Sequence, residues 1–388
     1  MKILVATFTY SPNVDGVSEA AGTMVRNFRH AGHEVYVATS PGDKPADAIN
    51  DGEVSVQRFL IAGAPALAAG FHGESQAYRD FIASLDPDVI IFHGWDTWPV
   101  EIALPLLPSP RARTVLLSHG YSSHLLNPKI LPHGFGKWLR WLPHVLSLPW
   151  RLRHFDKVVF LSHKTDWGRF FDARIARLTG ARNIAIIPNG VPELPDTTPR
   201  VFRQRHGIGA GPLFLCIANY SGRKNQERAL RAFAEAALPD ATLVLIGSEF
   251  GDYGRRMIAL WDRLKVGGGT GRALFLEGLQ RDETISALRD CDVKVRAADA
   301  ETQPIVLLEA MAASKPFIST NTGCVEEFKG GIVVREAAEM AKAMRRLATS
   351  HHERNRLGLE GRQDYEAHYS LEQTSKAWLQ LLEEVTAR

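Results

Sequence analysis

The sequence predicts an α/β protein with two Rossmann-like parallel-sheet domains that face each other across a cleft. Short apolar runs alternate with helical patterns along the whole chain, which favours parallel sheets covered by helices on both faces. The chain has 388 residues, 45% of them hydrophobic, and is too long for one ordinary core. The alternation stops once, in a proline-rich stretch at 189–200, and then starts again. In such proteins the cleft forms where the carboxyl ends of the strands meet.

The first domain is expected to span residues 1–188. Its apolar runs predict seven strands, at 2–7, 34–39, 54–59, 89–92, 114–118, 157–161 and 184–187. A helix is predicted at 16–30, because Val17, Met24 and Phe28 fall on one stripe at helical spacing. The pattern is that of strands buried on both faces.

The second domain is expected at 201–368, after a linker at 189–200. Its strands are predicted at 213–218, 242–246, 273–277, 293–296, 316–320 and 331–334. Its helices are predicted at 225–237, 252–266, 282–290, 305–313 and 337–349. A last helix is predicted within 369–388.

The bulk properties narrow the class of protein. A net charge of +3 does not point to nucleic acid, and none is expected as a partner. The cysteines Cys216, Cys291 and Cys324 are scattered, which argues for a reducing compartment and against a disulfide frame or zinc site. The first strand is too short for a signal peptide, and no apolar run approaches the roughly 20 residues of a membrane span. We therefore expect a cytoplasmic protein.

Two carboxylates in 301–312 predict a binding site. Glu301 falls in the loop after the strand 293–296, and Pro304 suits the first turn of a helix that contains Glu309. The free N–H groups at the start of that helix can hold a diphosphate, while carboxylates accept hydrogen bonds from sugar and ribose hydroxyls. A nucleotide sugar fits this pairing. The alternative is a solvent-facing Glu on an ordinary amphipathic helix.

The same residues resemble the E-x7-E signature of retaining glycosyltransferases of the GT-B fold, in particular family 4, the glycosyl transferases group 1. Three more segments, 117–120, 187–191 and 215–225, resemble sequences that these enzymes carry in the same order. The resemblance implies a hexosyltransferase that moves a sugar from a nucleoside diphosphate to a hydroxyl acceptor. It also implies that the last helix, within 369–388, packs back on the first domain.

The catalytic candidates are His119, Arg223, Lys224 and Glu301. Arg223 and Lys224 follow a strand at the mouth of a helix, where cations can neutralise a leaving diphosphate; a solvated basic turn is the alternative. By resemblance, Glu301 binds the donor sugar and Glu309 the ribose. His119 ends a strand and is expected to contact the donor sugar, without being assigned as a general base.

Two positions depart from the family pattern. Pro304 replaces a glycine and removes one N–H donor, so those of Gln303 and Ile305 would have to suffice. Asn219 stands where members have an arginine, which Arg223 would replace from nearby. These departures keep open a non-catalytic binding protein of the same fold.

The remaining candidates lie in loops that follow predicted strands. The donor-binding candidates are Gly16, Asn219, Gly247, Leu279, Gln303, Pro304, Ile305 and Glu309. The acceptor-side candidates are Asp15, Trp95, Asp96 and Tyr121. A Trp face can stack on a sugar ring, although Trp95 could equally belong to the core. The loop around Gly16 lacks the G-x-G-x-x-G pattern, which disfavours a nicotinamide dehydrogenase.

No cofactor or metal is expected, because no carboxylate cluster stands out as a metal site. The segment 134–153 mixes tryptophans, leucines and cations without an acid. Such a composition suits an anionic membrane surface at the inner face, and the alternative is a pair of helices packed into the first domain. The acceptor would then be a saccharide or lipid-linked glycan; a soluble acceptor is the alternative. A nucleotide-sugar epimerase stays open as a rival, while nothing in the sequence supports a pyridoxal-dependent phosphorylase.

Overall fold

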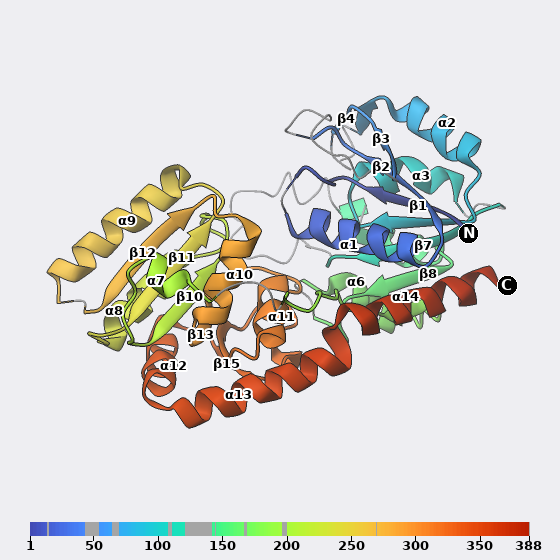
Figure 1. Ribbon diagram of the computed structural model, residues 1–388. Coiled ribbons are helices and arrows are strands. Elements are labelled where there is room, and N and C mark those ends of the chain that lie inside the picture. Colours follow the sequence, from blue (N-terminus) through green and yellow to red (C-terminus); the bar gives the residue numbers. More distant parts are fainter. Residues whose placement is uncertain are drawn as a thin grey trace. The chain divides into compact units, whose positions relative to one another are not determined.

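A computed structural model shows two α/β units, each with a parallel sheet (Figure 1). It describes residues 1–388 apart from 14, 43–53, 64–69, 108–110, 121–141, 144, 167–168, 196–199, 269 and 388. One unit comprises Met1–Asn189 and Thr374–Arg388, and the other comprises Gly190–Gln373. Two parallel-sheet α/β domains were predicted, and this is confirmed. The cleft between them stays a prediction.

The first unit is built on a seven-stranded parallel sheet in the order β3-β2-β1-β6-β7-β8-β9. Its strands are β1 (Lys2–Thr7), β2 (Glu34–Thr39), β3 (Ser55–Arg58), β6 (Val89–His93), β7 (Arg113–Ser118), β8 (Lys157–Phe160) and β9 (Ile184–Ile186). Each coincides with a predicted strand to within a residue. A hairpin of β4 (Ile61–Gly63) and β5 (Phe71–Gly73) was not predicted, because three-residue strands leave too short a pattern.

Helices cover this sheet. They are α1 (Gly16–His30), α2 (Ser75–Leu85), α3 (Trp98–Ala103), α5 (Leu148–Leu152), α6 (Phe171–Leu178) and α14 (Leu371–Thr386), with a 3₁₀ turn η2 at Leu104–Leu106. The last helix belongs to this core although it is far away in sequence. Trp378 of α14 meets Phe28 of α1 edge-on, with ring centroids 6.3 Å apart, and Lys157 Nζ lies 3.1 Å from Glu384 Oε2.

The second unit is built on a six-stranded parallel sheet in the order β12-β11-β10-β13-β14-β15. Its strands are β10 (Leu213–Ile217), β11 (Thr242–Gly247), β12 (Arg272–Glu277), β13 (Val293–Arg296), β14 (Phe317–Thr320) and β15 (Gly331–Val334). Its helices are α7 (Phe202–Arg205), α8 (Gln226–Ala236), α9 (Gly251–Val266), α10 (Arg281–Asp290), α11 (Ile305–Ala312), α12 (Ala337–Thr349) and α13 (His351–Asp364). Short helical turns η5 (Val325–Glu327) and η6 (Tyr365–Tyr369) complete it.

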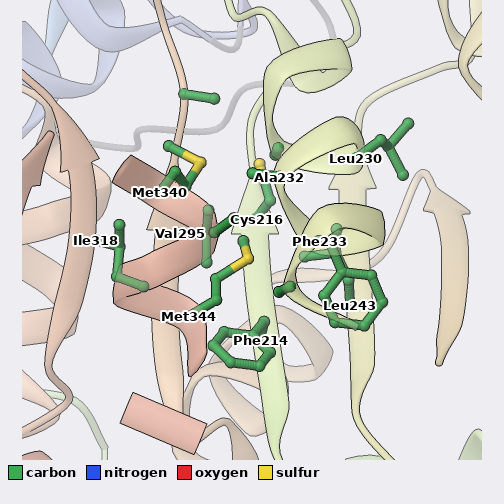
Figure 2. Close-up of a cluster of buried hydrophobic side chains, with 14 of the residues drawn as sticks. Phe214, Cys216, Leu230, Ala232, Phe233, Leu243, Val295, Ile318, Met340 and Met344 are labelled. Atoms are coloured by element: carbon green, nitrogen blue, oxygen red, sulfur yellow. The ribbon is translucent and has the colours of Figure 1, made fainter. Parts of the chain in front are cut away.

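The two faces of this sheet have separate cores, and β13 shows how they differ. On one face, Figure 2 shows Val295 of β13 with Met340 and Met344 of α12, in a cluster that also includes Phe233 of α8. Successive side chains of a strand point to opposite faces, so Lys294 and Arg296 point away from this cluster. Both lie in the interior, with 0% and 5% of their surface exposed. Two cations therefore point to the face opposite α12.

From Gly190 on, the described part of the stretch predicted as a linker belongs to the second unit. Val191 is buried, its N–H donates to Tyr369 O at 3.0 Å, and its carbonyl accepts from Leu371 N at 3.0 Å. Leu194 joins the core that α10 provides. The chain thus passes between the units at Asn189 and Gly190, and again at Gln373 and Thr374.

Candidate functional site

In the second unit, Lys224 and Glu301 meet at the carboxyl edge of the sheet. Lys224 follows β10 and Glu301 follows β13, and these strands are parallel neighbours. Loops after neighbouring parallel strands leave from the same edge. Lys224 Nζ lies 2.9 and 2.6 Å from the two carboxylate oxygens of Glu301, and both side chains are about one-fifth exposed, at 21%. The structure therefore brings these two predicted catalytic residues together as an ion pair.

Arg296 lies behind this pair and was not singled out in the sequence. Its Nη2 atom is 3.6 Å from Glu301 Oε2, and only 5% of the residue is exposed. The guanidinium donates to Ser319 Oγ at 3.0 Å and to Thr322 Oγ1 at 2.7 Å. Burial lowers the pKa of Arg296, and the charge of Glu301 raises it in part. Glu301 thus has two cations near it, Lys224 from a loop and Arg296 from a strand.

Glu309 lies inside α11, 8% exposed, and its Oε1 atom accepts a bond from Arg281 Nη2 at 2.5 Å. Lys294 is close enough for the charge of Glu309 to raise its pKa, although burial dominates and lowers that pKa to about 8. Within the described residues, Lys294 Nζ has no hydrogen-bond partner. Binding of ribose hydroxyls by Glu309 stays a prediction.

The start of α11 is held firmly against the next loop. Gln303 and Pro304 are buried, and Thr302 O accepts from Cys324 N at 2.9 Å. Gly323 has φ +63°, and a Cβ there would lie 2.1 Å from Thr302 O. Only glycine fits at this position, so the loop that follows β14 fixes the backbone that precedes α11. Ile305 follows, half-buried, with the N–H expected to face an anion.

The other candidates in the second unit differ in how far they are buried. Arg223 and Asn219 are exposed, and Leu279 is half-buried against the core on the α10 face. Gly247 ends β11, where a Cβ would lie 2.5 Å from the Tyr220 ring. Its lack of a side chain is thus explained by packing alone. Contact between Gly247 and a ligand stays a prediction.

In the first unit, His119 pairs with His93, which was not among the predicted site residues. The two residues end the neighbouring strands β7 and β6, and His119 Nε2 lies 3.2 Å from His93 Nδ1. Burial lowers the pKa of His119 to about 4 and that of His93 well below its usual range. Both imidazoles are therefore neutral at pH 7. The pair is suited to hydrogen bonding with hydroxyls.

The loop before α1 lies near this pair, since the charge of Asp15 raises the pKa of His119 in part. Asp15 caps α1: Oδ1 accepts from Val17 N at 2.9 Å and from Ser18 N at 3.0 Å. Gly16 is exposed, and apart from its chain neighbours and its own helix backbone no atom of the described residues lies within 4 Å of the point where a Cβ would stand. A ligand can therefore approach the backbone closely at Gly16.

The expectation that Trp95 presents a face to a sugar is wrong, because its ring is buried and only 6% of the residue is exposed. Trp95 Nε1 donates to Asp172 Oδ2 at 2.7 Å, and the Ser118 hydroxyl donates to the same carboxylate. Burial raises the pKa of Asp172, which those bonds partly offset. Asp96 follows with φ 59° and is half-exposed. Tyr121 lies outside the described residues.

The segment 134–153 is described only at 142–143 and 145–153. There the buried Arg151 forms a bidentate salt bridge with Glu101, and both N–O distances are 2.6 Å. Leu148 and Leu152 are fully buried, whereas Trp150 is 55% exposed. Packing into the first unit therefore explains part of this segment, and Arg151 is not available to an anionic lipid surface. Of the other cations in the segment, Arg153 is exposed, whereas Lys137 and Arg140 lie outside the described residues.

Sequence reasoning missed Arg296, Lys294 and Asp172. The run Val-Lys-Val-Arg of β13 gave no clear signal, because its alternation also fits a half-exposed strand, and the middle position of β13 in the sheet is known only from the structure. Asp172 gave no signal, because its partners come from two distant strand ends. In the described part of the chain, no group of three or more His, Cys, Asp or Glu side chains is placed to hold a metal ion. Nor is any helix there long and apolar enough to cross a membrane.

Two models of known protein families match this chain, one in each half. The model for glycosyl transferases group 1 matches residues 200–364, and the model for a glycosyl transferase 4-like domain matches residues 15–190. The chain therefore belongs to the group 1 glycosyltransferases of the GT-B fold, as the sequence predicted.

Individual proteins agree with this assignment. A GDP-mannose-dependent α-(1-6)-phosphatidylinositol monomannoside mannosyltransferase of Mycobacterium tuberculosis is 26% identical over 384 residues, 93% of each chain. Sucrose-phosphate synthase from Thermosynechococcus elongatus has a TM-score of 0.78 at 17% identity, covering 100% of both chains. HepE of Anabaena, solved with UDP, has a TM-score of 0.74 at 17% identity, covering 99% of this chain and 100% of HepE. At such identities the two structures support the fold alone.

Proposed function

We propose that the protein is a retaining, metal-independent hexosyltransferase that transfers mannose from GDP-mannose to a hydroxyl of a saccharide or lipid-linked glycan. The observation that carries this proposal is the ion pair of Lys224 and Glu301 at the carboxyl edge of the second sheet, with Glu309 on the helix that follows Glu301 in the chain. A leaving nucleoside diphosphate gains negative charge as the glycosidic bond breaks, and a fixed cation stabilises that charge. The carboxylates accept bonds from hydroxyls.

The choice of donor rests on the mycobacterial relative, whose name specifies GDP-mannose and which matches almost the whole chain. A uridine donor is the alternative, since HepE has also been solved with UDP-glucose. The retention of configuration rests on the E-x7-E resemblance. Metal independence is proposed because the cations of the second unit can themselves neutralise a diphosphate.

The acceptor is proposed to be at the inner face of a membrane, with the enzyme cytoplasmic and peripheral. The relative's named acceptor is a lipid, and Trp150 and Leu146 are exposed by 55% and 70% on the first unit. Exposed aromatic and leucine side chains suit the headgroup boundary. The proposal predicts that anionic liposomes sediment the protein at low salt, and that Trp150→Ala reduces this. A protein that stays in the supernatant contradicts it.

The main test uses purified full-length protein with a panel of GDP- and UDP-sugars, with and without EDTA. Thermal shift identifies the nucleotide, because a ligand at a hundredfold excess over Kd adds about 2.7 kcal/mol to stability. NMR of the product gives the anomeric configuration. We expect GDP-mannose to be consumed and the α configuration kept in EDTA. Inversion, a metal requirement, or preference for a UDP-sugar would each reject the corresponding part of the proposal.

A further inference from the structure

We propose that Arg296 is a positioning residue that retains Glu301 for the donor sugar when a bound diphosphate draws Lys224 away. This inference rests on the proposed function, because it assigns Lys224 to the diphosphate and Glu301 to the sugar. It begins from a conflict between these two roles. In the structure, Lys224 Nζ binds both oxygens of Glu301, at 2.9 and 2.6 Å. Neither residue can fully serve the donor while this pair persists.

Binding of the donor resolves the conflict in favour of the diphosphate. A diphosphate carries more negative charge than one carboxylate, so the Coulomb attraction of an ammonium toward it is larger at equal distance. Lys224 lies on a loop and is 21% exposed, so its long side chain can turn. Glu301 then loses its nearest cation at the moment when its oxygens must receive the sugar hydroxyls.

Arg296 is placed to remain with Glu301. It belongs to β13 itself, and its guanidinium is bonded to Ser319 Oγ and Thr322 Oγ1 at 3.0 and 2.7 Å. At 3.6 Å from Glu301 Oε2, it needs only a small shift for a direct hydrogen bond. Among the described residues, Glu301 is the only acid within 4 Å of this guanidinium. Arg296 and Glu301 are thus the natural pair once Lys224 has left.

The expected consequence is selective. Without the charge of Arg296, Glu301 is no longer held in place once Lys224 has turned to the diphosphate, and its carboxylate misses the hydroxyls of the sugar. Binding of the nucleoside diphosphate alone does not need Glu301 in its sugar-binding position. Loss of Arg296 should therefore affect reactions of the nucleotide sugar much more than binding of GDP.

The test compares Arg296→Met and Arg296→Lys with the wild type and with Arg203→Met. Arg203 is a matched control, because it pairs with Asp292 at 2.7 Å beside the opposite end of β13. Calorimetry gives Kd for GDP, and kinetics give kcat and KM for the nucleotide sugar. For Arg296→Met we expect GDP affinity within about twofold of wild type and kcat/KM lower by about 10- to 100-fold, the range for hydrogen bonds to charged groups. Arg296→Lys should restore part of the lost kcat/KM. Arg203→Met should not lower kcat/KM more than it lowers the affinity for GDP.

A double-mutant cycle with Glu301→Gln shows whether Arg296 acts through Glu301. In the Glu301→Gln background, replacing Arg296 should have little further effect on kcat/KM. Additive losses, equal losses of GDP binding and turnover, or no loss at all would overturn the inference. If Arg296→Met does not fold, Arg296→Lys serves in the same cycle. Absence of nucleotide binding by the wild type would reject the proposed function and this inference with it, whereas intact wild-type activity with additive losses rejects the inference alone.

Discussion

Both sheets carry polar groups at their carboxyl edges. The groups of the first sheet are kept uncharged, whereas those of the second are charged and form ion pairs. In the first unit, burial keeps His93 and His119 uncharged, and raises the pKa of Asp172. In the second unit, charges are kept and paired, as in Lys224 with Glu301 and Arg281 with Glu309. A neutral cluster recognises hydroxyls, while ion pairs can exchange partners with an anion. The difference teaches that one sheet edge presents neutral polar groups, whereas the other presents charged side chains that are already paired.

The largest expected effect tests the charged edge. Lys224→Met should lower kcat/KM for the nucleotide sugar by about 10²- to 10³-fold, the loss typical when one donor to a developing anion is removed. Steady-state kinetics measure it. Lys265→Met is the control, because Lys265 lies exposed at the end of α9. A loss below tenfold would contradict the role of Lys224 in neutralising the leaving group.

The next effect concerns Lys294, whose charge is buried without a hydrogen-bond partner in the described residues. Burial lowers its pKa from 10.5 to about 8. Below pH 8 the folded protein therefore buries a charged ammonium group, whereas between pH 8 and 10.5 folding releases the proton of that group. The unfolded chain binds more protons between pH 8 and 10.5, and stability therefore rises with pH across that window. Lys294→Met should stabilise the protein by about 3 kcal/mol at pH 7 and by much less at pH 10.

Chemical unfolding at the two pH values measures this gain. A variant that is destabilised at pH 7 would show that Lys294 has a favourable partner which outweighs its burial. A gain of equal size at both pH values would mean that the effect comes from packing and not from charge.

A smaller effect tests the neutral edge. Burial lowers the pKa of His119 from 6.5 to about 4, so the unfolded chain binds more protons in that window and stability falls as pH falls through it. His119→Gln should reduce the loss of unfolding free energy between pH 7 and 4.5 by roughly 2 kcal/mol. His163→Gln serves as the exposed control. Equal acid sensitivity of the wild type and His119→Gln would refute the neutral pair.

The smallest effect is expected for Arg281, which is 55% exposed although it bonds Glu309 at 2.5 Å. Exposed ion pairs contribute about 0–1 kcal/mol, because water and salt screen them. Arg281→Met should therefore change the KM for the nucleotide sugar by no more than about fivefold. A larger rise would mean that Arg281 itself binds the donor, and the charged edge would extend to α10.

Sequence reasoning predicted the framework because buried parallel strands leave continuous apolar runs, as in β1 and β10. The family motifs then pointed to Lys224, Glu301 and Glu309, since each motif is local to one loop and the helix that follows it. Arg296 could not be placed in the same way. Its alternation with Val295 fits a half-exposed strand, and only the helices on both faces of the sheet show that its charge is buried.

The prediction for Trp95 was wrong for a related reason. A tryptophan after a strand end can point to a ligand or into the core, and the sequence does not reveal a distant acceptor such as Asp172. The linker prediction relied on prolines, which mark irregular backbone. It could not show that Val191 pairs with the chain around Ser370 and is therefore part of a packed unit.

A crystal structure of the full chain with GDP tests the central claim most directly. We expect the diphosphate to lie about 3 Å from Lys224 Nζ, at hydrogen-bond distance, with Glu301 released toward Arg296. A diphosphate bound elsewhere, or one bound while Lys224 still holds both oxygens of Glu301, would contradict the account.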